Sequence, residues 1–475
     1  MKRSQVLSRL KPGIAILIPL LVLLIPPDWI LPGMSVVEHR VLALFVLAAL
    51  FWILEPIPIF ATSVLIIVLE LVMVSDQGFV LFRSAPGGEA WTNLLDYKEI
   101  MGTFASPIIL LFLGGFFLAM SATKFRMDQN LAAVLLKPFG TKPKVLLLGL
   151  MGITAVFSMF MSNTATTAMM LSILVPVMAV LDEDEPGRMA FALGIPFAAN
   201  IGGIGTPIGT PPNAIALKYI SGPASISFGD WMVFAVPYAL ILLLICWLLL
   251  LYFFPFKTKA VQVQIKGRFM RTPKAYIVYG TFILTLGLWL TDFLHGMNAY
   301  VVAMIPVAVF LSGGIIGKED LKGISWDVLW LVAGGIALGL ALEKSGLVNR
   351  LVDAIPFAGQ AAFLVMFLAA VVGLLMANFM SNTGTANLLL PIIAALGTSG
   401  MNMESVGGST GLIIGVTLSI CLGMSLPISS PPNALAHAAF GIKTQHMAKT
   451  GILIGVIGLV GAMLLVLLLN NLNFF

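Results

Sequence analysis

Met161-Ser162-Asn163-Thr164 and Met380-Ser381-Asn382-Thr383 are two copies of one tetrapeptide, and they decide how this chain folds. Each copy is followed by a turn with two prolines, Thr210-Pro211-Pro212-Asn213 after the first and Ser430-Pro431-Pro432-Asn433 after the second. The spacing is nearly equal, 48 residues from Ser162 to Thr210 and 49 from Ser381 to Ser430. Helix-breaking polar segments at corresponding positions of two apolar halves indicate the binding site of a secondary transporter.

The composition around these motifs is that of a membrane protein. The 475 residues have a mean hydropathy of +1.04 and are 59% hydrophobic and 10% charged, whereas soluble domains are about a quarter charged. The bilayer must therefore serve as the solvent. The net charge of +5 does not indicate a nucleic-acid partner, because the basic residues lie in loops beside apolar segments. Cys246 and Cys421 lie in apolar runs, which predicts buried thiols without a disulfide.

Apolar windows predict an all-α integral membrane protein with eleven transmembrane helices. Two further apolar segments, 145–180 and 358–397, are too long for one crossing and hold the tetrapeptides near their centres. We interpret each as a re-entrant helical hairpin, which enters the membrane and returns on the same side. The predicted spans are 13–31, 38–55, 58–75, 106–123, 188–220, 231–254, 275–292, 299–316, 327–344, 409–440 and 450–470.

Basic clusters predict the orientation, because Lys and Arg are enriched in cytoplasmic loops. Four clusters fall on one face only if the hairpins do not cross, which supports the hairpin interpretation. The N-terminus is then cytoplasmic and leads into an uncleaved first helix, and the tail Asn470–Phe475, without a basic residue, lies outside. The clusters are Lys2–Lys11; Lys124, Arg126, Lys137, Lys142 and Lys144; Lys257, Lys259, Lys266, Arg268, Arg271 and Lys274; and Lys443 with Lys449.

The tetrapeptides belong to a wider duplication. Phe112–Gly115 aligns with Val332–Gly335 at an offset of 220, and both segments end in a glycine pair that predicts close helix packing. Five predicted crossings separate the copies, so they are inverted and form two facing half-sites near the midplane. The predicted domains are 1–105 (spans 1–3), 106–254 (first inverted repeat, hairpin 145–180, broken span 188–220), 255–274 (basic cytoplasmic linker), 275–326 (spans 7–8) and 327–475 (second inverted repeat, hairpin 358–397, broken span 409–440, last span).

The hairpin tips have the chemistry of an anion site without fixed cations. The second arm of each hairpin begins at its tetrapeptide, so the positive end of a helix points at the tip. The amides and hydroxyls of Asn163, Thr164, Asn382 and Thr383 add donors that suit a carboxylate. Helix capping without a ligand is the alternative, and the presence of two copies at predicted membrane depth argues against it.

The Pro-Pro-Asn turns break the fifth and tenth predicted spans. Proline removes backbone donors and frees carbonyls, and the neighbouring glycines permit unusual backbone conformations. Unwound backbone at this depth is tolerated only where it lines a cavity or is buried in protein. Freed carbonyls beside Ser, Thr and Asn oxygens predict sites for a hard cation. A proline kink used only for packing is the alternative.

Three titratable residues lie in or near apolar segments. Glu70 is a candidate for proton coupling, and Glu55 is interpreted as a turn residue because Pro56 follows it. His437 is interpreted as a packed neutral imidazole in preference to a pH-sensitive group. The sequence has no metal-ligand cluster, nucleotide loop or nucleophile–base pair, which argues against an enzyme. Polarity confined to two points argues against a passive channel.

At these motifs, and over nearly its whole length, the chain resembles the divalent-anion/sodium symporter family of bacterial dicarboxylate transporters and animal sodium–carboxylate cotransporters. The matching pieces are Ser162-Asn163-Thr164, Ser381-Asn382-Thr383 and the turns at 209–213 and 430–433. The resemblance implies a homodimer in the bacterial inner membrane. It also implies an elevator mechanism, in which a scaffold domain, mostly 1–105 and 275–326, holds a moving transport domain.

The resemblance also implies ligands. The expected function is sodium-coupled symport of C4-dicarboxylates such as succinate, malate or fumarate, and the expected partners are this substrate, Na+ and membrane lipids. The alternatives are a sodium-independent exchanger and a transporter of citrate or sulfate. Substrate-binding residues would be Ser162, Asn163, Thr164, Thr210, Pro211, Ser381, Asn382, Thr383, Ser430 and Pro431. Sodium ligands would be Ser158, Ser162, Asn163 and Gly209 at one site, and Asn382 with backbone carbonyls near Ala377, Met380 and Ser429 at another. Some relatives have a hydroxyl where this chain has Ala377, which weakens the second site.

Overall fold

The computed structural model describes residues 2–84, 91–220, 225–261, 269–354, 360–398 and 402–475. Lys266 and Arg268 of the basic linker, and the side chains of residues 2–10, lie outside this description. Every regular element in the described residues is helical, and a single isolated bridge joins Ser75 to Leu95. The chain is therefore an all-helical membrane protein.

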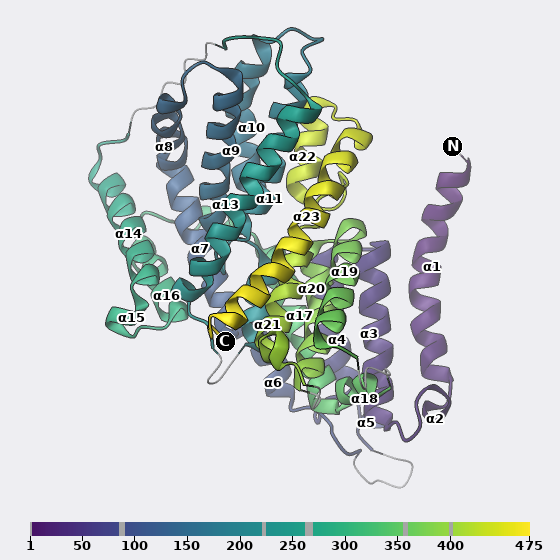
Figure 1. The fold of residues 1–475 in the computed structure, drawn as a ribbon. Helices are drawn as coiled ribbons and strands as arrows, with labels where there is room; N and C mark the ends of the chain where they lie inside the picture. Colours follow the sequence, from purple (N-terminus) through teal and green to yellow (C-terminus); the bar gives the residue numbers. More distant parts are fainter. Residues whose placement is uncertain (1, 85–90, 221–224, 262–268, 355–359, 399–401) are drawn as a thin grey trace.

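The first half of the chain contains the first hairpin and the first broken span (Figure 1). Its helices are α1 (Lys2–Leu24), α2 (Pro27–Ile30), α3 (Val36–Leu54), α4 (Ile59–Met73), α5 (Val80–Arg83), α6 (Tyr97–Gly102), α7 (Pro107–Lys124), α8 (Met127–Leu136), α9 (Pro143–Phe160), α10 (Asn163–Ala179), α11 (Gly187–Gly203), α12 (Pro211–Tyr219) and α13 (Phe228–Phe253).

The second half repeats the order of α7 to α13 in α17 to α23, after the three helices α14 to α16. Its helices are α14 (Pro273–Leu290), α15 (Asp292–His295), α16 (Ala299–Ser312), α17 (Trp326–Ser345), α18 (Leu347–Asp353), α19 (Ala362–Phe379), α20 (Asn382–Thr398), α21 (Gly408–Ile420), α22 (Pro431–Phe440) and α23 (Thr444–Asn471).

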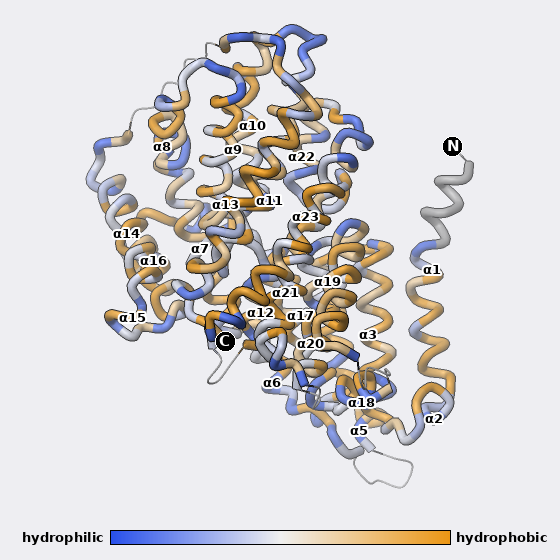
Figure 2. The backbone as a smooth tube through the Cα atoms, viewed as in Figure 1, coloured by the Kyte–Doolittle hydropathy of each residue, from blue (hydrophilic) through white to orange (hydrophobic). Residues whose placement is uncertain are grey.

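Eight helices in the described residues are long and apolar enough to cross a membrane. Hydrophobic residues run along the lengths of the helices, and hydrophilic residues gather near their ends (Figure 2). Shorter apolar helices, including α4, α16 and α21, occupy other predicted spans. Two of the eight long helices, α9 and α19, are hairpin arms. The helical membrane architecture is confirmed, and the count of eleven crossings stays a prediction.

Each tetrapeptide separates two helices, α9 from α10 and α19 from α20. The serine of each copy caps the helix that follows it. The Ser162 hydroxyl oxygen accepts a hydrogen bond from the Ala165 N–H (3.2 Å). The Ser381 hydroxyl oxygen accepts one from the Gly384 N–H (3.0 Å). The same local chemistry thus ends one arm of each hairpin and starts the other.

The two broken spans have matching unwound loops. The first unwound loop, residues 204–210, joins α11 to α12, and the second, residues 421–430, joins α21 to α22. Proline occupies the first position of α12 and of α22. Proline fits there because the first helical residue needs no backbone donor.

The helices pack into two groups. The frame bundle comprises α1, α3, α4, α7, α14, α16 and α17, in which α4 packs on α17 and α7 on α16. The hairpin bundle comprises α9 to α13 and α19 to α23, and within it α9, α10, α11 and α22 lie side by side (Figure 1). The two bundles meet where α20 packs against α17.

The predicted close packing at both glycine pairs is confirmed. A Cβ atom at Gly114 of α7 would overlap the Ala303 backbone of α16. A Cβ atom at Gly334 of α17 would overlap Ser63 of α4. Both repeats therefore use glycine to bring two helices of the frame bundle together.

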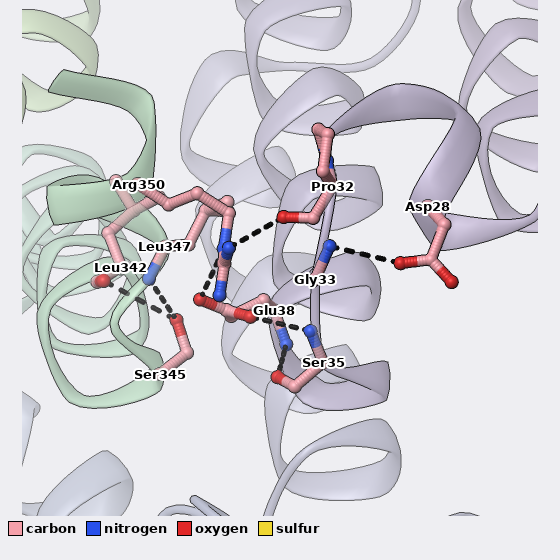
Figure 3. Close-up of polar contacts among 9 residues, drawn as sticks. All are labelled: Asp28, Pro32, Gly33, Ser35, Glu38, Leu342, Ser345, Leu347 and Arg350. Atoms are coloured by element: carbon pink, nitrogen blue, oxygen red, sulfur yellow. Dashed lines mark hydrogen bonds and ion pairs between the residues drawn. The ribbon is translucent and has the colours of Figure 1, made fainter. Parts of the chain in front are cut away.

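Polar contacts fasten the N-terminal part of the frame bundle to α18 (Figure 3). The Arg350 guanidinium donates to the Glu38 carboxylate (3.0 Å) and to the Pro32 carbonyl (2.9 Å). Glu38 also completes a capping box with Ser35 at the start of α3. One ion pair thus joins the start of α3 to the short helix that follows α17.

The remaining predictions at single residues have mixed outcomes. Glu55 ends α3 in a left-handed conformation with φ of 49°, which confirms the turn. Both predicted thiols are buried and free. His437 Nδ1 lies 2.6 Å from the Ile442 carbonyl oxygen, so the ring is partnered. Glu70 is fully buried without a hydrogen-bond partner in the described part of the chain, and proton coupling through it stays a prediction.

Candidate substrate-binding site

A cavity of about 350 Å³ lies between the two bundles. The frame bundle contributes side chains of α4, α7 and α17, and the hairpin bundle contributes both hairpin tips and both unwound loops. All ten residues expected to bind substrate line this one cavity, namely Ser162, Asn163, Thr164, Thr210, Pro211, Ser381, Asn382, Thr383, Ser430 and Pro431. The fold thus brings together two motifs that are 219 residues apart.

Four helices begin at this cavity. Asn163, Pro211, Asn382 and Pro431 are the first residues of α10, α12, α20 and α22, and all four line it. Each helix N-terminus carries a partial positive charge of roughly half an elementary charge from its unpaired N–H groups. Their convergence brings partial positive charge to the cavity without a basic side chain, which suits an anionic ligand.

Formal charge in the cavity is limited to one acidic residue. Among the described lining residues there is no Lys or Arg, and Asp327 at the start of α17 is the single charged group. Sequence reasoning did not find Asp327, because it lies in the frame bundle far from both tetrapeptides. The apolar remainder includes Phe60, Phe112 and Phe116.

The first unwound loop is held by one asparagine side chain. The Asn213 amide nitrogen donates to the carbonyls of Gly203 (3.1 Å), Ile204 (3.1 Å) and Thr206 (2.8 Å). Asn213 itself is fully buried. The freed carbonyls predicted for this segment are therefore partly satisfied within the protein.

The second unwound loop is held in the same way. The Asn433 amide nitrogen donates to the carbonyls of Met424 (2.7 Å) and Leu426 (3.0 Å). Met424 and Leu426 stand 220 residues after Ile204 and Thr206. The asparagine of each Pro-Pro-Asn turn thus braces the loop before it, which explains why both turns contain this residue.

A hydroxyl also ties the first unwound loop to its hairpin. The Thr206 hydroxyl donates to the Met159 carbonyl at the end of α9. It also accepts a hydrogen bond from the Gly209 N–H (3.0 Å). One hydroxyl thus fixes the loop internally and against the hairpin.

The second unwound loop is also tied to its hairpin by a hydroxyl, but this hydroxyl lies near the C-terminal end of the loop and not near its start. The Ser429 hydroxyl donates to the Asn378 carbonyl (3.0 Å) and accepts from the Leu426 N–H (3.0 Å). Asn378 is the counterpart of Met159, and Leu426 is the counterpart of Thr206. Donor and acceptor positions within the loop are therefore exchanged between the repeats.

The residues of the first expected sodium site form a close oxygen cluster. The Ser158 hydroxyl donates to the Asn163 side-chain oxygen (2.5 Å). The Asn163 amide and the Gly209 carbonyl both lie against Gly203, where a Cβ atom would meet them at 2.7 and 3.0 Å. Neutral oxygen donors of this kind suit a hard cation.

The second expected sodium site is less complete. Its position equivalent to Ser158 is Ala377, which is buried and has no hydroxyl. The Asn382 amide nitrogen donates weakly to the Cys421 carbonyl (3.5 Å), and its side-chain oxygen is buried without a partner. An unpartnered buried oxygen fits a cation ligand. Ser158, Ala377 and Met380 do not line the cavity, whereas Gly209 and Ser429 do. The described residues contain no group of three or more His, Cys, Asp or Glu that could hold a metal.

A second cavity of about 340 Å³ shares Phe116 and Ser162 with the first. Lys124 lines it, and the Lys124 ammonium contacts the Asp320 carboxylate (2.6 Å). A hydrogen bond from the Gly317 N–H, followed by the one from Lys124, lowers the pKa of Asp320 below its usual value. The basic group beside the first hairpin is therefore neutralised by an ion pair.

Comparison with known sequences places the chain among transporters. The family model described as citrate transporter matches residues 49–409. The inorganic phosphate transporter PHO87 of Saccharomyces cerevisiae is 29% identical over 426 residues, which are 87% of this chain and 44% of that protein. The sodium-dependent dicarboxylate transporter SdcS of Staphylococcus saprophyticus is 30% identical over 465 residues, 90% of this chain and 85% of that protein. The chain thus spans less than half of the yeast relative.

Solved structures share the fold at low sequence identity. The YdaH transporter of Alcanivorax borkumensis matches with a TM-score of 0.54 and 13% identity, over 78% of this chain and 87% of that one. The MtrF protein of Neisseria gonorrhoeae matches with a TM-score of 0.50 and 11% identity, over 88% of this chain and 96% of that one. These matches concern the arrangement of helices.

Proposed function

The chain belongs to the citrate transporter family, and from this premise we propose that it is a sodium-coupled symporter of C4-dicarboxylates such as succinate, malate or fumarate. The transporter class itself follows from the family, and the protein is not an enzyme. The proposal adds the substrate, the coupling ion and the residues that bind them.

One observation carries the substrate proposal. Both hairpin tips and both turns face a single cavity at which four helices begin and no basic side chain stands among the described lining residues. Two related sets of neutral donors suit a substrate with two anionic ends. In the proposed pose, Ser162, Asn163 and Thr164 hold one carboxylate, and Ser381, Asn382 and Thr383 hold the other. Thr210 and Ser430 supply further hydroxyls.

Sodium is proposed to bind behind the tips. The first site would use Ser158, Ser162, Asn163 and the Gly209 carbonyl, and the second would use Asn382 with carbonyls near Ala377, Met380 and Ser429. The close Ser158–Asn163 contact and the unpartnered Asn382 oxygen support these assignments. The name of the SdcS relative, a sodium-dependent dicarboxylate transporter, supports the coupling. Bound sodium would offset the substrate charge and order the tips.

The frame bundle is proposed to be the scaffold and the hairpin bundle the moving domain of an elevator. The position of the cavity between the bundles supports this division. Eleven crossings, two re-entrant hairpins, a cytoplasmic N-terminus, an external C-terminus and a homodimer complete the proposal. A ligand shifts such an equilibrium only through its differential affinity for the two states.

Phosphate is the second candidate substrate, because curated yeast relatives at 29–30% identity are named phosphate transporters. Citrate, after which the family model is described, and sulfate are further alternatives within the same class. A compact tetrahedral anion would occupy one half-site, whereas a dicarboxylate would bridge both.

Radiolabelled succinate uptake into proteoliposomes tests the proposal. We expect uptake that depends on an inward sodium gradient and is inhibited more by unlabelled malate than by phosphate, citrate or sulfate. Uptake that ignores the gradient but requires internal dicarboxylate would identify an exchanger. Uptake of phosphate with no uptake of succinate would reject the substrate proposal.

A further inference from the structure

Asn200 lies in α11, one turn before the first unwound loop, and only 3% of it is exposed. Its amide nitrogen donates to the Ser430 hydroxyl oxygen (3.0 Å) and to the Asn433 side-chain oxygen (3.2 Å). These partners lie 230 and 233 residues further along the chain. Asn200 also lines the cavity. A side chain of the first repeat therefore completes the half-site of the second.

The orientation of the Asn200 amide follows from its neighbours. The Asn433 amide nitrogen is occupied by the carbonyls of Met424 and Leu426, so its oxygen is the atom that faces Asn200. Asn200 must consequently present its nitrogen, because two amide oxygens would repel each other. The same nitrogen donates to Ser430.

A serine hydroxyl has one hydrogen and can also accept hydrogen bonds. Because the Ser430 oxygen accepts from Asn200, the hydroxyl hydrogen is free to point elsewhere, and Ser430 lines the cavity. We propose that Asn200 is a positioning residue, which orients the Ser430 hydroxyl so that it donates to an anionic oxygen of the substrate. This inference rests on the proposed function of the cavity.

The first half-site has no asparagine that orients the hydroxyl of its turn residue, Thr210. The residue 220 positions after Asn200 is Ile420, which has no donor. The Asn213 oxygen accepts instead from the Cys421 thiol (3.3 Å), a weak donor. The Thr210 hydroxyl makes no hydrogen bond within the described residues. Ser430 is thus pre-oriented as a donor, whereas Thr210 is free to rotate.

A double-mutant cycle of Asn200→Ala and Ser430→Ala tests the inference, with the anion that the wild-type protein takes up best as substrate. We expect each single variant to raise KM about tenfold, since Ser430→Ala removes one hydrogen bond to a charged group and Asn200→Ala removes the contact that orients it. Maximal rate should change less than twofold. The double variant should be no worse than Ser430→Ala, because Asn200 acts through Ser430. Asn200→Asp should raise KM further, because a carboxylate would attract the hydroxyl hydrogen away from the substrate.

Ser419→Ala is the matched control. Ser419 is buried on α21, the counterpart of α11, and its hydroxyl bonds the Gly415 carbonyl of its own helix. Its loss should leave KM unchanged. Size-exclusion chromatography checks that each variant folds, and if Asn200→Ala does not fold, Asn200→Leu, which keeps the volume but has no donor, takes its place in the cycle.

The inference would be overturned if the KM of the double variant rose by the product of the two single-variant increases. An Asn200 variant with a reduced maximal rate and a normal KM would also overturn it. The failure of the proposed function has a different signature, which the wild-type protein alone shows: it would take up phosphate but not succinate, or none of succinate, citrate, phosphate and sulfate.

Discussion

The two half-sites share a backbone frame but differ in the side chains around it. Asn213 and Asn433 brace equivalent carbonyls, and Ser162 and Ser381 cap equivalent helices. The oxygens beside this frame differ, because the Ser158 hydroxyl contacts Asn163 whereas the corresponding Ala377 has none. The asparagine braces and the serine caps are thus common to both repeats, whereas the oxygens that would meet an ion or a substrate are not.

The largest expected effect comes from removing the asparagine side chain at either hairpin tip. Asn163→Ala and Asn382→Ala should each lower uptake more than 100-fold, because each removes an amide that is proposed to contact both sodium and substrate. Size-exclusion chromatography should show a folded protein in both cases. Wild-type uptake rates from both variants would refute the proposed site.

The bracing asparagines should matter for stability equally in both repeats. Asn213→Ala and Asn433→Ala each leave two or three buried carbonyls without their donor, which we expect to lower the free energy of unfolding by about 2–3 kcal/mol. An SDS unfolding titration measures this. The exposed Asn349 provides the control, and Asn349→Ala should stay within about 0.5 kcal/mol of wild type. A loss at one asparagine only would show that the frames are not equivalent.

Ser158→Ala should erase the main difference between the half-sites. Loss of one hydroxyl ligand should raise the sodium concentration for half-maximal uptake about tenfold, which corresponds to about 1.4 kcal/mol. Thr154→Ala, one turn earlier on α9 with a buried hydroxyl bonded to the Leu150 carbonyl, is the control. An unchanged sodium dependence would exclude Ser158 as a ligand.

Ala377→Ser introduces the missing hydroxyl into the second half-site. Ala377 stands five residues before Asn382, as Ser158 stands five before Asn163. The new hydroxyl can reach the unpartnered Asn382 oxygen, so we expect the sodium concentration for half-maximal uptake to fall about threefold. Titration of uptake against sodium measures the change. A rise instead would indicate that crowding by Gly423 outweighs the added ligand.

The smallest effect should come from a substitution at Thr210 that keeps its hydroxyl group. Thr210→Ser removes a methyl group and keeps the donor, so KM for the transported anion should change less than twofold. Competition between labelled and unlabelled substrate is sensitive enough to check this. A tenfold change would mean that the Thr210 methyl group shapes the cavity.

The sequence was sufficient to predict local features. The helix pairs at the two tetrapeptides, the unwound loops before the two Pro-Pro-Asn turns and the glycine contacts at Gly114 and Gly334 follow from patterns within a few tens of residues. These patterns are predictive because proline, glycine and helix-capping residues determine the backbone conformation at and next to their own positions.

Contacts between distant segments were beyond such reasoning. Asn200 is one polar residue within an apolar span, and nothing near it indicates that its partners are Ser430 and Asn433. The exchanged roles of Thr206 and Ser429 are also invisible in the alignment of the repeats, since neither residue matches the other by position. Asp327 enters the cavity only because α17 packs against the hairpin bundle.

The bond from Asn200 to Asn433 also bears on biogenesis. During synthesis, α11 leaves the ribosome long before residue 433 exists, and a chain grows by roughly 5–20 residues per second. The Asn200 amide must therefore wait, for ten seconds or more, for the acceptors that it finally meets. A first repeat produced alone would lack those acceptors, so we expect co-expressed halves to recover a folded protein that neither half forms by itself.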